Sequence, residues 1–223
     1  MRSSLLLASH SPRRRELLTA AGYDFEIASP QVDEKFYVDL TLRELAALNA
    51  IRKGLSIARA QPEKVVLAAD TLVALERKIM GKPRDLDEAR KILRRLSGQT
   101  HEVCSAVFVC HLARARSTAF YEISRVRFHR LTEQKIDNYL AKVNPLDKAG
   151  AYAAQSGRSD IIERITGSFT NVVGLPMEKT AAALADFGIF PSRVAKAFRP
   201  VPLLLRGDVP SSRVSKRDTK TKR

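Results

Sequence analysis

The chain has 223 residues, of which 44% are hydrophobic and 28% charged, ordinary values for a folded domain with a core. No apolar run approaches the ~20 residues that a helix needs to cross a bilayer. The short apolar run near the N-terminus has neither the length nor the small-residue cleavage site of a signal peptide, so we expect a cytoplasmic protein without a membrane partner.

The net charge of +15 is concentrated toward the C-terminal end. Between Pro191 and Arg223, ten Lys and Arg residues stand against two Asp, so this segment carries +8 and the preceding 190 residues carry +7. Its four prolines are typical of a flexible extension. We therefore predict a domain over residues 1–190 and a basic tail over residues 191–223. A solubilising role is the simplest interpretation of the tail. Weak contact with RNA or a membrane surface stays open, and nucleic acid is otherwise not expected as a partner.

The first predicted elements are a buried strand and a helix with a polar loop between them. The apolar run Leu5–Ala8 favours a strand, and Pro12 suits a first helical turn because its missing N–H would have no partner there. We expect free backbone N–H groups and the positive helix end around Ser9 and Ser11. Together these features favour an anion, above all a phosphate.

Three arginines occupy the first turn of this helix: Arg13, Arg14 and Arg15. Successive helix residues point ~100° apart, so the three side chains cannot all face one ligand. We expect Arg13 and Arg14 to reach the phosphate. A solvated basic face is the alternative interpretation, although positive charges oppose the helix dipole at this end.

An acidic pair follows the second predicted strand. Residues 23–28 alternate between apolar and polar side chains, which favours a short strand, and Asp33 and Glu34 come shortly after it. A loop exposed to water is the ordinary interpretation of such a pair. Binding of a metal is the alternative, and we attach it to Glu34.

Thr41 and Glu44 form the pattern of a capping box at the start of a long helix. Apolar side chains recur at helical spacing and predict its buried face: Leu45, Leu48, Ile51, Leu55 and Ala58. Lys53 lies off this stripe. It is either solvated or placed to reach a phosphate.

The most informative carboxylate, Asp70, lies inside an apolar segment. Residues 65–67 favour a strand buried in an α/β sheet, and the apolar run resumes at residues 72–75 after Asp70 and Thr71 interrupt it. A carboxylate in such surroundings is unfavourable unless it is paired, hydrogen-bonded or bound to a metal. A structural aspartate that ties a loop is the alternative to a catalytic one.

Two further segments favour close approach of a ligand. Residues 76–78 predict a hairpin tip, after which Lys82 is held in a stiff turn between a glycine and a proline. The stretch 147–157 consists largely of small residues, as in the wall of a pocket. Its polar positions are Asp147, Lys148, Tyr152 and Gln155.

Helical and strand patterns follow one another in the rest of the chain. Residues 85–96 predict an amphipathic helix, and residues 101–112 and 117–128 predict an antiparallel hairpin. The remaining predictions are a helix from Thr132 that ends at Asn144-Pro145, a strand at 161–165, a loop at 167–171 and a last helix that ends near Phe187.

The two cysteines, Cys104 and Cys110, are an even number of residues apart and should share one face of a strand, too far apart to form a disulfide. His101 and His111 flank them. Because the chain has no Cys-x-x-Cys pair, and free cysteine is common in cores, we expect neither a zinc site nor an oxidising compartment.

Seven motifs occur in order: SHSPRRREL at 9–17, VDE at 32–34, AADTLV at 68–73, GKPRD at 81–85, LSGQTHEV at 96–103, DKAGAYAAQ at 147–155 and GSFTNVVGLP at 167–176. Each alone is unspecific, but together they resemble the Maf family (septum-formation-inhibitor-like nucleotide pyrophosphatases) over about residues 4–188. The tail lies outside this resemblance.

The resemblance implies an α/β fold like that of the inosine-triphosphate pyrophosphatases, with a long mixed β-sheet in two lobes, flanking helices and a central cleft. It implies an enzyme that hydrolyses nucleoside triphosphates to the monophosphate and pyrophosphate with a divalent cation, Mg²⁺ or Mn²⁺. The motifs DKAGAY…Q and GSF…VVGLP match the branch that acts on dTTP and UTP. A house-cleaning role on modified pyrimidine nucleotides and a homodimer are further expectations of the family.

The resemblance also assigns roles. Asp70 matches the catalytic aspartate, and Arg13, Thr71 and Gln155 match positions that set base preference. The chain departs from the pattern at Ala154, where many members of the pyrimidine branch have isoleucine.

The chemistry of the residues fits this reaction. Hydrolysis between the α- and β-phosphates needs charge neutralisation, an in-line water and an acceptor for its proton. Asp70 and Glu34 suit Mg²⁺, and Asp70 either binds this metal or accepts the proton. The competing function is a regulator of cell division that binds nucleotide or nucleic acid without catalysis. The candidate substrate-binding residues are Ser9, Ser11, Arg13, Arg14, Glu34, Lys53 and Lys82.

Overall fold

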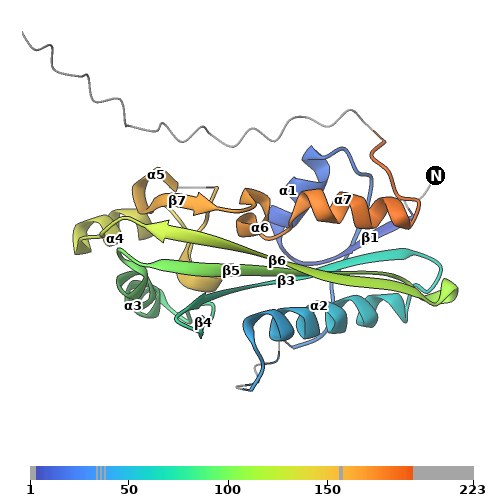
Figure 1. The fold of residues 1–223 in the computed structure, drawn as a ribbon, viewed down its shortest axis with the longest axis horizontal. Helices are drawn as coiled ribbons and strands as arrows, with labels where there is room; N and C mark the ends of the chain where they lie inside the picture. Colours follow the sequence, from blue (N-terminus) through green and yellow to red (C-terminus); the bar gives the residue numbers. More distant parts are fainter. Residues whose placement is uncertain (1–3, 34, 36, 38, 156–157, 193–223) are drawn as a thin grey trace, which may run out of the picture.

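A mixed seven-stranded sheet with helices on both faces forms the protein, which is therefore an α/β fold (Figure 1). The structure is a computed structural model that describes residues 4–192 except residues 34, 36, 38, 156 and 157. Residues 193–223 of the predicted tail therefore lie outside the described part. Within the described part, no helix combines the length and the apolar composition needed to cross a bilayer.

The strands follow the order β2-β1-β3-β5-β6-β7, with β4 paired to β3. Pairing is parallel between β2, β1 and β3 and antiparallel from β3 onward. The strands are β1 Leu5–Ala8, β2 Glu26–Ala28, β3 Val65–Leu75, β4 Lys78–Met80, β5 Thr100–His111, β6 Arg116–Phe128 and β7 Ile162–Thr166.

The helices lie in two layers. Figure 1 shows α2 along one face of the sheet and α1, α6 and α7 on the opposite face. The helices are α1 Pro12–Ala20, α2 Leu42–Ala58, α3 Leu86–Leu96, α4 Glu133–Leu140, α5 Arg158–Ile161, α6 Phe169–Val173 and α7 Met177–Asp186, with 3₁₀ turns η1 Leu112–Arg114 and η2 Ala149–Ala151.

Strand β3 lies in the centre of the sheet, and its register leaves an opening. On one side β3 pairs with β5 from Val65 to Ala74. On its other side β1 pairs only as far as Ala68, and β4 begins only at Val73. In the described registers, residues 69–72 of β3 therefore have no strand partner on that side. Asp70 and Thr71 lie in this opening.

Residues along β3 alternate between the two faces of the sheet, as the pleat requires. Val66, Ala68 and Leu72 belong to the core beneath α2, whereas Leu67 and Val73 belong to the core on the opposite face. The same alternation places Asp70 toward α2 and Thr71 toward the opposite face. The two neighbours in sequence thus face different layers of the protein.

Helix α2 begins with the predicted capping box, in which Glu44 N–H donates to Thr41 Oγ1 and Thr41 N–H donates to the Glu44 carboxylate. Its fully buried face differs from the predicted stripe, because Leu48, Ile51 and Leu55 are only half-buried. A Cβ at Gly54 would lie 2.5 Å from the ring of Phe108, so the helix approaches the sheet closely there. The buried residues are Leu45, Ala46, Asn49, Ala50, Gly54 and Ala58.

Most of the other predicted elements are confirmed, with shorter bounds in some cases. Strand β1, the helix that starts at Pro12 and the β5–β6 hairpin are present, and Cys104 and Cys110 are both buried in the core beneath α2. Residues 65–75 form one continuous strand, so Asp70 and Thr71 do not interrupt it. The predicted loop at 167–171 is wrong in part, because Ser168 caps the short helix α6.

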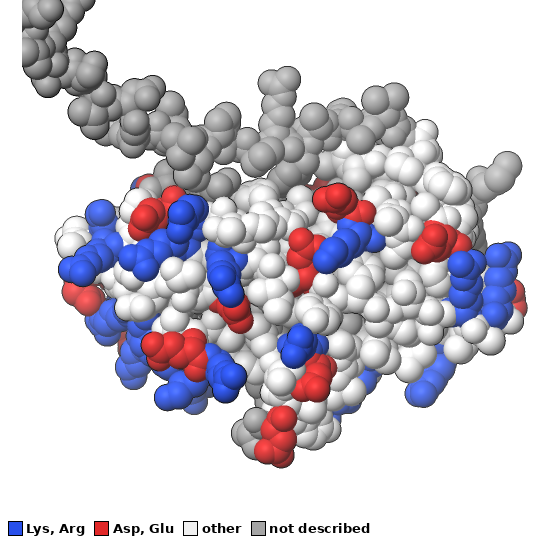
Figure 2. Space-filling model, viewed as in Figure 1, with Lys and Arg blue, Asp and Glu red and all other residues white. Residues whose placement is uncertain are grey.

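Charged side chains of both signs are interspersed on the face shown in Figure 2. This face therefore carries mixed charge rather than one uniform basic patch. Elsewhere, ion pairs link helices α3 and α4: Arg90 with Asp137 and Arg94 with Glu133.

Candidate active site

A cavity of about 290 Å³ lies at the opening in the sheet. It brings together residues from the β1–α1 loop, from α2, from β3 and from the segment around η2. The predicted site residues that line it are Ser9, Ser11, Arg13, Arg14, Lys53, Asp70, Thr71 and Lys82. Residues more than 70 positions apart in the sequence thus share one cavity.

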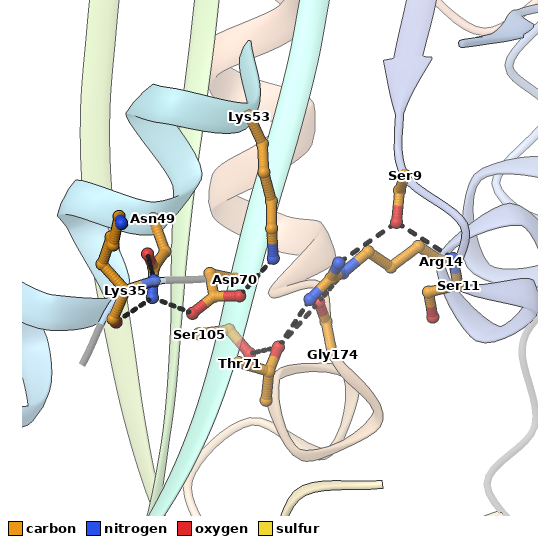
Figure 3. A network of polar contacts seen from close by, with 10 residues as sticks. All are labelled: Ser9, Ser11, Arg14, Lys35, Asn49, Lys53, Asp70, Thr71, Ser105 and Gly174. Atoms are coloured by element: carbon orange, nitrogen blue, oxygen red, sulfur yellow. Dashed lines mark hydrogen bonds and ion pairs between the residues drawn. The ribbon is translucent and has the colours of Figure 1, made fainter. Parts of the chain in front are cut away.

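Asp70 is only 3% exposed and is held from one helix (Figure 3). Lys53 Nζ lies 2.6 Å from Asp70 Oδ1, and Asn49 Nδ2 lies 3.5 Å from Asp70 Oδ2. Asn49 and Lys53 are four residues apart on α2, so both side chains leave the same face of the helix. The ion pair compensates the burial of the carboxylate, and it places Lys53 in the cavity rather than in bulk water.

Asn49 was not predicted as a site residue. Its side-chain oxygen accepts from Lys35 N–H at 3.0 Å, and its Nδ2 donates to the Lys35 carbonyl at 3.2 Å. These two bonds fix the orientation of the amide and turn Nδ2 toward Asp70. The available signal was a polar residue within the small-residue face of α2, four positions before Lys53.

Arg14 is buried on the other face of the sheet and donates three hydrogen bonds. Its Nε donates to the Gly174 carbonyl at 2.9 Å, one terminal nitrogen donates to Ser9 Oγ at 3.1 Å, and the other donates to Thr71 Oγ1 at 3.0 Å. The guanidinium therefore joins the β1–α1 loop, β3 and the end of α6 (Figure 3).

The loop before α1 differs from the expectation of free N–H groups. Ser9 N–H donates to the Leu7 carbonyl, and Ser11 N–H donates to Ser9 Oγ. The positive charge at this end of the cavity therefore comes from the arginine side chains and the helix end rather than from these two amides. Arg15 does not line the cavity, as the angular spacing predicted.

Arg13 and Lys148 converge on Asp147 at the edge of the cavity. Arg13 lies 3.2 Å from one oxygen of Asp147, and Lys148 Nζ lies 2.5 Å from the other. Partial burial alone would raise the pKa of Asp147, but the hydrogen bond from Lys148 and the charges of Lys148 and Arg13 outweigh it and lower the pKa. Asp147 thus remains charged and holds both cations at the rim.

The small-residue segment forms the predicted wall. Tyr152, Ala153 and Ala154 line the cavity, and the Tyr152 hydroxyl lies 2.8 Å from His101 Nε2. Burial lowers the pKa of His101 to about 4, so the imidazole is neutral at pH 7. Lys82 lines the cavity from the turn before α3, where the Gly81 carbonyl accepts from Gly150 N–H.

Two predicted residues are not placed in the cavity. Gln155 is half-buried, is not among the lining residues, and has its Nε2 3.4 Å from Glu16 Oε2. Glu34 lies outside the described residues, so the structure does not test its role as a metal ligand. Both roles therefore remain predictions.

Among the described residues, no group of three or more His, Cys, Asp or Glu side chains is arranged so that it could hold a metal ion. Burial raises the pKa of Cys104 to about 12 and that of Cys110 to about 11, so both thiols are protonated at neutral pH.

The comparisons agree with the motif pattern. The family model described as "Maf-like protein" matches residues 4–187. A dTTP/UTP pyrophosphatase of Bacillus pumilus (strain SAFR-032) is 41% identical over 189 residues, which are 85% of this chain and 99% of that protein. A dTTP/UTP pyrophosphatase of Bacillus cereus (strain B4264) is 40% identical over 185 residues, 83% of this chain and 96% of that protein.

Among solved structures, the Staphylococcus aureus Ham1 protein aligns with a TM-score of 0.40 and 15% identity, covering 56% of this chain and 71% of that chain. A likeness this weak shows neither a shared site nor a shared reaction. The family match and the two relatives, in contrast, cover nearly all of the predicted domain. The chain therefore belongs to the Maf-like protein family.

Proposed function

We propose that the protein is a nucleoside triphosphate pyrophosphatase, a hydrolase that cleaves between the α- and β-phosphates and releases the monophosphate and pyrophosphate. The observation that carries the proposal is the opening in the sheet, where the buried carboxylate of Asp70 shares one cavity with five Lys and Arg side chains. The names of the two bacterial relatives support the same reaction. The five cations are Arg13, Arg14, Lys53, Lys82 and Lys148.

The cationic residues account for binding of the triphosphate. A triphosphate carries charge on several oxygens, and cations in a largely enclosed cavity bind it with charge-assisted hydrogen bonds. Arg13 and Lys82 lie toward the rim, whereas Arg14 and Lys53 lie deeper. We assign Arg13 and Arg14 to the phosphate oxygens, with the hydroxyls of Ser9 and Ser11 in the adjoining loop.

Asp70 accounts for the chemical step. Its Oδ1 is paired with Lys53, while among the described residues the contact of Oδ2 is a distant neutral donor from Asn49. A carboxylate in this state can accept the proton of the attacking water. The ion pair also orients the carboxylate, because Lys53 holds Oδ1 while Oδ2 faces the neutral amide of Asn49.

A divalent cation, Mg²⁺ or Mn²⁺, fits the residues present. Mg²⁺ binds through one or two carboxylates together with phosphate oxygens and water, and the Asp70 carboxylate is a suitable oxygen donor. Glu34, outside the described residues, is the second proposed ligand. When bound, the ion supplies positive charge to the phosphates.

The finer expectations belong to the same proposal. The preferred substrates are dTTP, UTP or modified pyrimidine nucleotides, with Arg13, Thr71 and Gln155 setting the base preference. The sheet is divided into two lobes like that of the inosine-triphosphate pyrophosphatases, and the cleft lies at the opening along β3. The protein acts in the cytoplasm as a homodimer, and the basic tail makes at most weak contact with nucleic acid.

The test is product analysis. Purified protein is incubated with Mg²⁺ and each of dTTP, UTP, dCTP, CTP, GTP and ATP, and the products are separated by ion-exchange chromatography. The proposal predicts monophosphate and pyrophosphate in equal amounts, fastest from dTTP and UTP. Diphosphate with inorganic phosphate would indicate a phosphatase instead, and nucleotide binding without turnover would indicate a regulator.

A further inference from the structure

A directed chain of hydrogen bonds lies behind Arg14, on the face of the sheet opposite Asp70. Thr71 of β3 and Ser105 of β5 are direct cross-strand partners, and their hydroxyl oxygens lie 2.8 Å apart. Ser105 Oγ lies 2.9 Å from the backbone carbonyl of Asn171 in α6. Arg14, at the other end, lies 3.0 Å from Thr71 Oγ1.

The chemistry of the two ends favours one direction for the protons in this chain. A guanidinium only donates, and a backbone carbonyl only accepts. With the Ser105 proton directed to the Asn171 carbonyl at 2.9 Å, Ser105 Oγ accepts from Thr71, and Thr71 accepts from Arg14. The chain then runs from Arg14 through Thr71 and Ser105 to Asn171, and the Gly174 carbonyl, 3.3 Å away, is the second acceptor within reach of Thr71 Oγ1.

Asn171 anchors this chain. It is fully buried, its Oδ1 accepts from Ser105 N–H at 3.1 Å, and its Nδ2 donates to the Val103 carbonyl at 3.0 Å and to Ser124 Oγ at 2.9 Å. These bonds attach α6 to β5 and β6. Because the amide is satisfied on both sides, its position in the core is well determined.

The C-terminal end of helix α6 also provides a second hydrogen-bond acceptor for Arg14. The helix ends at Gly174, whose carbonyl accepts from Arg14 Nε at 2.9 Å and lies 3.3 Å from Thr71 Oγ1. Gly174 has φ +127°, a conformation that L side chains rarely adopt. One short helix therefore places both the end of the chain at Asn171 and the carbonyl that receives Arg14.

The surroundings of Thr71 limit what its hydroxyl can do. The oxygen has three polar neighbours, Arg14, Ser105 and the Gly174 carbonyl, and its covalent bond to Cβ is the fourth direction. A hydroxyl oxygen accommodates about four tetrahedral directions in all. The hydroxyl of Thr71 is therefore placed to act on a substrate through Arg14.

We propose that Ser105 and Asn171 are positioning residues that set the guanidinium of Arg14 in the substrate cavity through Thr71. This inference rests on the proposed function, in which Arg14 binds phosphate oxygens. It extends the site to two residues that do not line the cavity. The GSFTN motif then helps to position the substrate-binding Arg14 in addition to packing in the core.

The experiment compares two serines with similar hydrogen bonds, one inside the network and one outside it. Ser105→Ala breaks the chain between Thr71 and Asn171. Ser97→Ala is the control, since Ser97 also donates to a backbone carbonyl (that of Leu131, at 3.4 Å) and also accepts from a neighbour (Leu131 N–H, at 2.7 Å), and it does not line the cavity. A purely structural role predicts equal effects of the two substitutions.

Two readouts are measured on the full-length protein: the Kd for inorganic tripolyphosphate by calorimetry, and kcat and KM for UTP. Loss of a hydrogen bond that positions a charged group should weaken tripolyphosphate binding about fivefold to tenfold in Ser105→Ala, with KM raised by a similar factor. We expect kcat to change less than about twofold, since a ground-state phosphate contact is retained in the transition state. Ser97→Ala should stay within about twofold of wild type in both readouts, at a comparable loss of thermal stability.

Equal changes in Kd for the two variants, or an unchanged Kd in Ser105→Ala, would overturn the inference. The calorimetric readout separates this result from failure of the proposed function. If the wild-type protein binds tripolyphosphate but does not release pyrophosphate from UTP, the proposed reaction fails while the positioning of Arg14 is still tested by the two Kd values.

Discussion

The two faces of β3 at the opening solve the burial of polar groups in different ways. On the α2 face, Asp70 is compensated by charge, with Lys53 at 2.6 Å. On the opposite face, Thr71 belongs to a chain of hydrogen bonds that ends on a buried amide. One strand can thus carry a buried, ion-paired carboxylate and a hydroxyl that holds an arginine at successive residues, because the pleat separates them.

The largest expected effect concerns the charged face. Asp70→Asn should lower the rate of pyrophosphate release from UTP about 10²-fold to 10⁴-fold, as for removal of a general base. Circular dichroism should show an unchanged fold, since the amide fills the same volume. Turnover near the wild-type rate would remove Asp70 from the chemical step and leave the charged face with only a structural role.

Lys53→Met tests whether charge compensation stabilises that face. It leaves the Asp70 carboxylate buried without its cation, which should lower the free energy of unfolding by about 3–5 kcal/mol. Lys64→Met is the control, because Lys64 pairs with Glu26 at 2.7 Å on the surface and should contribute only about 0–1 kcal/mol. Urea denaturation at neutral pH measures both. Similar losses of unfolding free energy in the two variants would show that the buried Lys53–Asp70 pair stabilises the fold no more than a surface pair.

Asn49 offers a finer test of the same face. Asn49→Asp would place a carboxylate oxygen against the Lys35 carbonyl and Asp70 Oδ2, whereas Asn49→Leu substitutes an apolar side chain of similar size. We expect Asn49→Asp to lower the free energy of unfolding by about 2–4 kcal/mol and Asn49→Leu by about 1–2 kcal/mol. Thermal and urea unfolding compare the two. A more stable Asn49→Asp variant would contradict the assigned orientation of the amide.

The smallest expected effect concerns base preference. Gln155 contacts Glu16 of α1, the helix that also carries Arg13 and Arg14. If Gln155 reads the pyrimidine edge, Gln155→Ala should lower the UTP/GTP ratio of kcat/KM about threefold to tenfold, the value of one hydrogen bond. Gln134→Ala, on the exposed face of α4, is the control. A ratio equal to that of the control would exclude Gln155 from base recognition.

Local chemistry explains which parts of the site could be predicted from the sequence. The strand at Leu5–Ala8, the helix start at Pro12 and the capping box at Thr41 depend on neighbouring residues, and their patterns were sufficient. The angular spacing of the arginines also sufficed to separate Arg13 and Arg14 from Arg15. Asp70 was identifiable because a carboxylate in an apolar run requires a partner.

The remaining features depend on contacts between distant segments. The opening along β3 results from where β1 stops and β4 starts, and strand register has no short sequence signal. The second contact of Asp70 is with the amide of Asn49, and the sequence around Asn49 does not distinguish it from an ordinary helix residue. The predicted loop at 167–171 hid both α6 and the buried amide of Asn171, because its Ser, Thr and Asn side chains are equally typical of loops and caps.

The most direct test of the central claim compares the two faces in one kinetic experiment. The kcat and KM for UTP are measured for Asp70→Asn and Thr71→Val, two nearly isosteric substitutions of adjacent residues. The account predicts a large fall in kcat for Asp70→Asn, and for Thr71→Val a raised KM with kcat largely retained. A fall in kcat of similar size for both variants, or a raised KM in Asp70→Asn alone, would contradict the account, in which Asp70 serves the chemical step and Thr71 the binding of the phosphates.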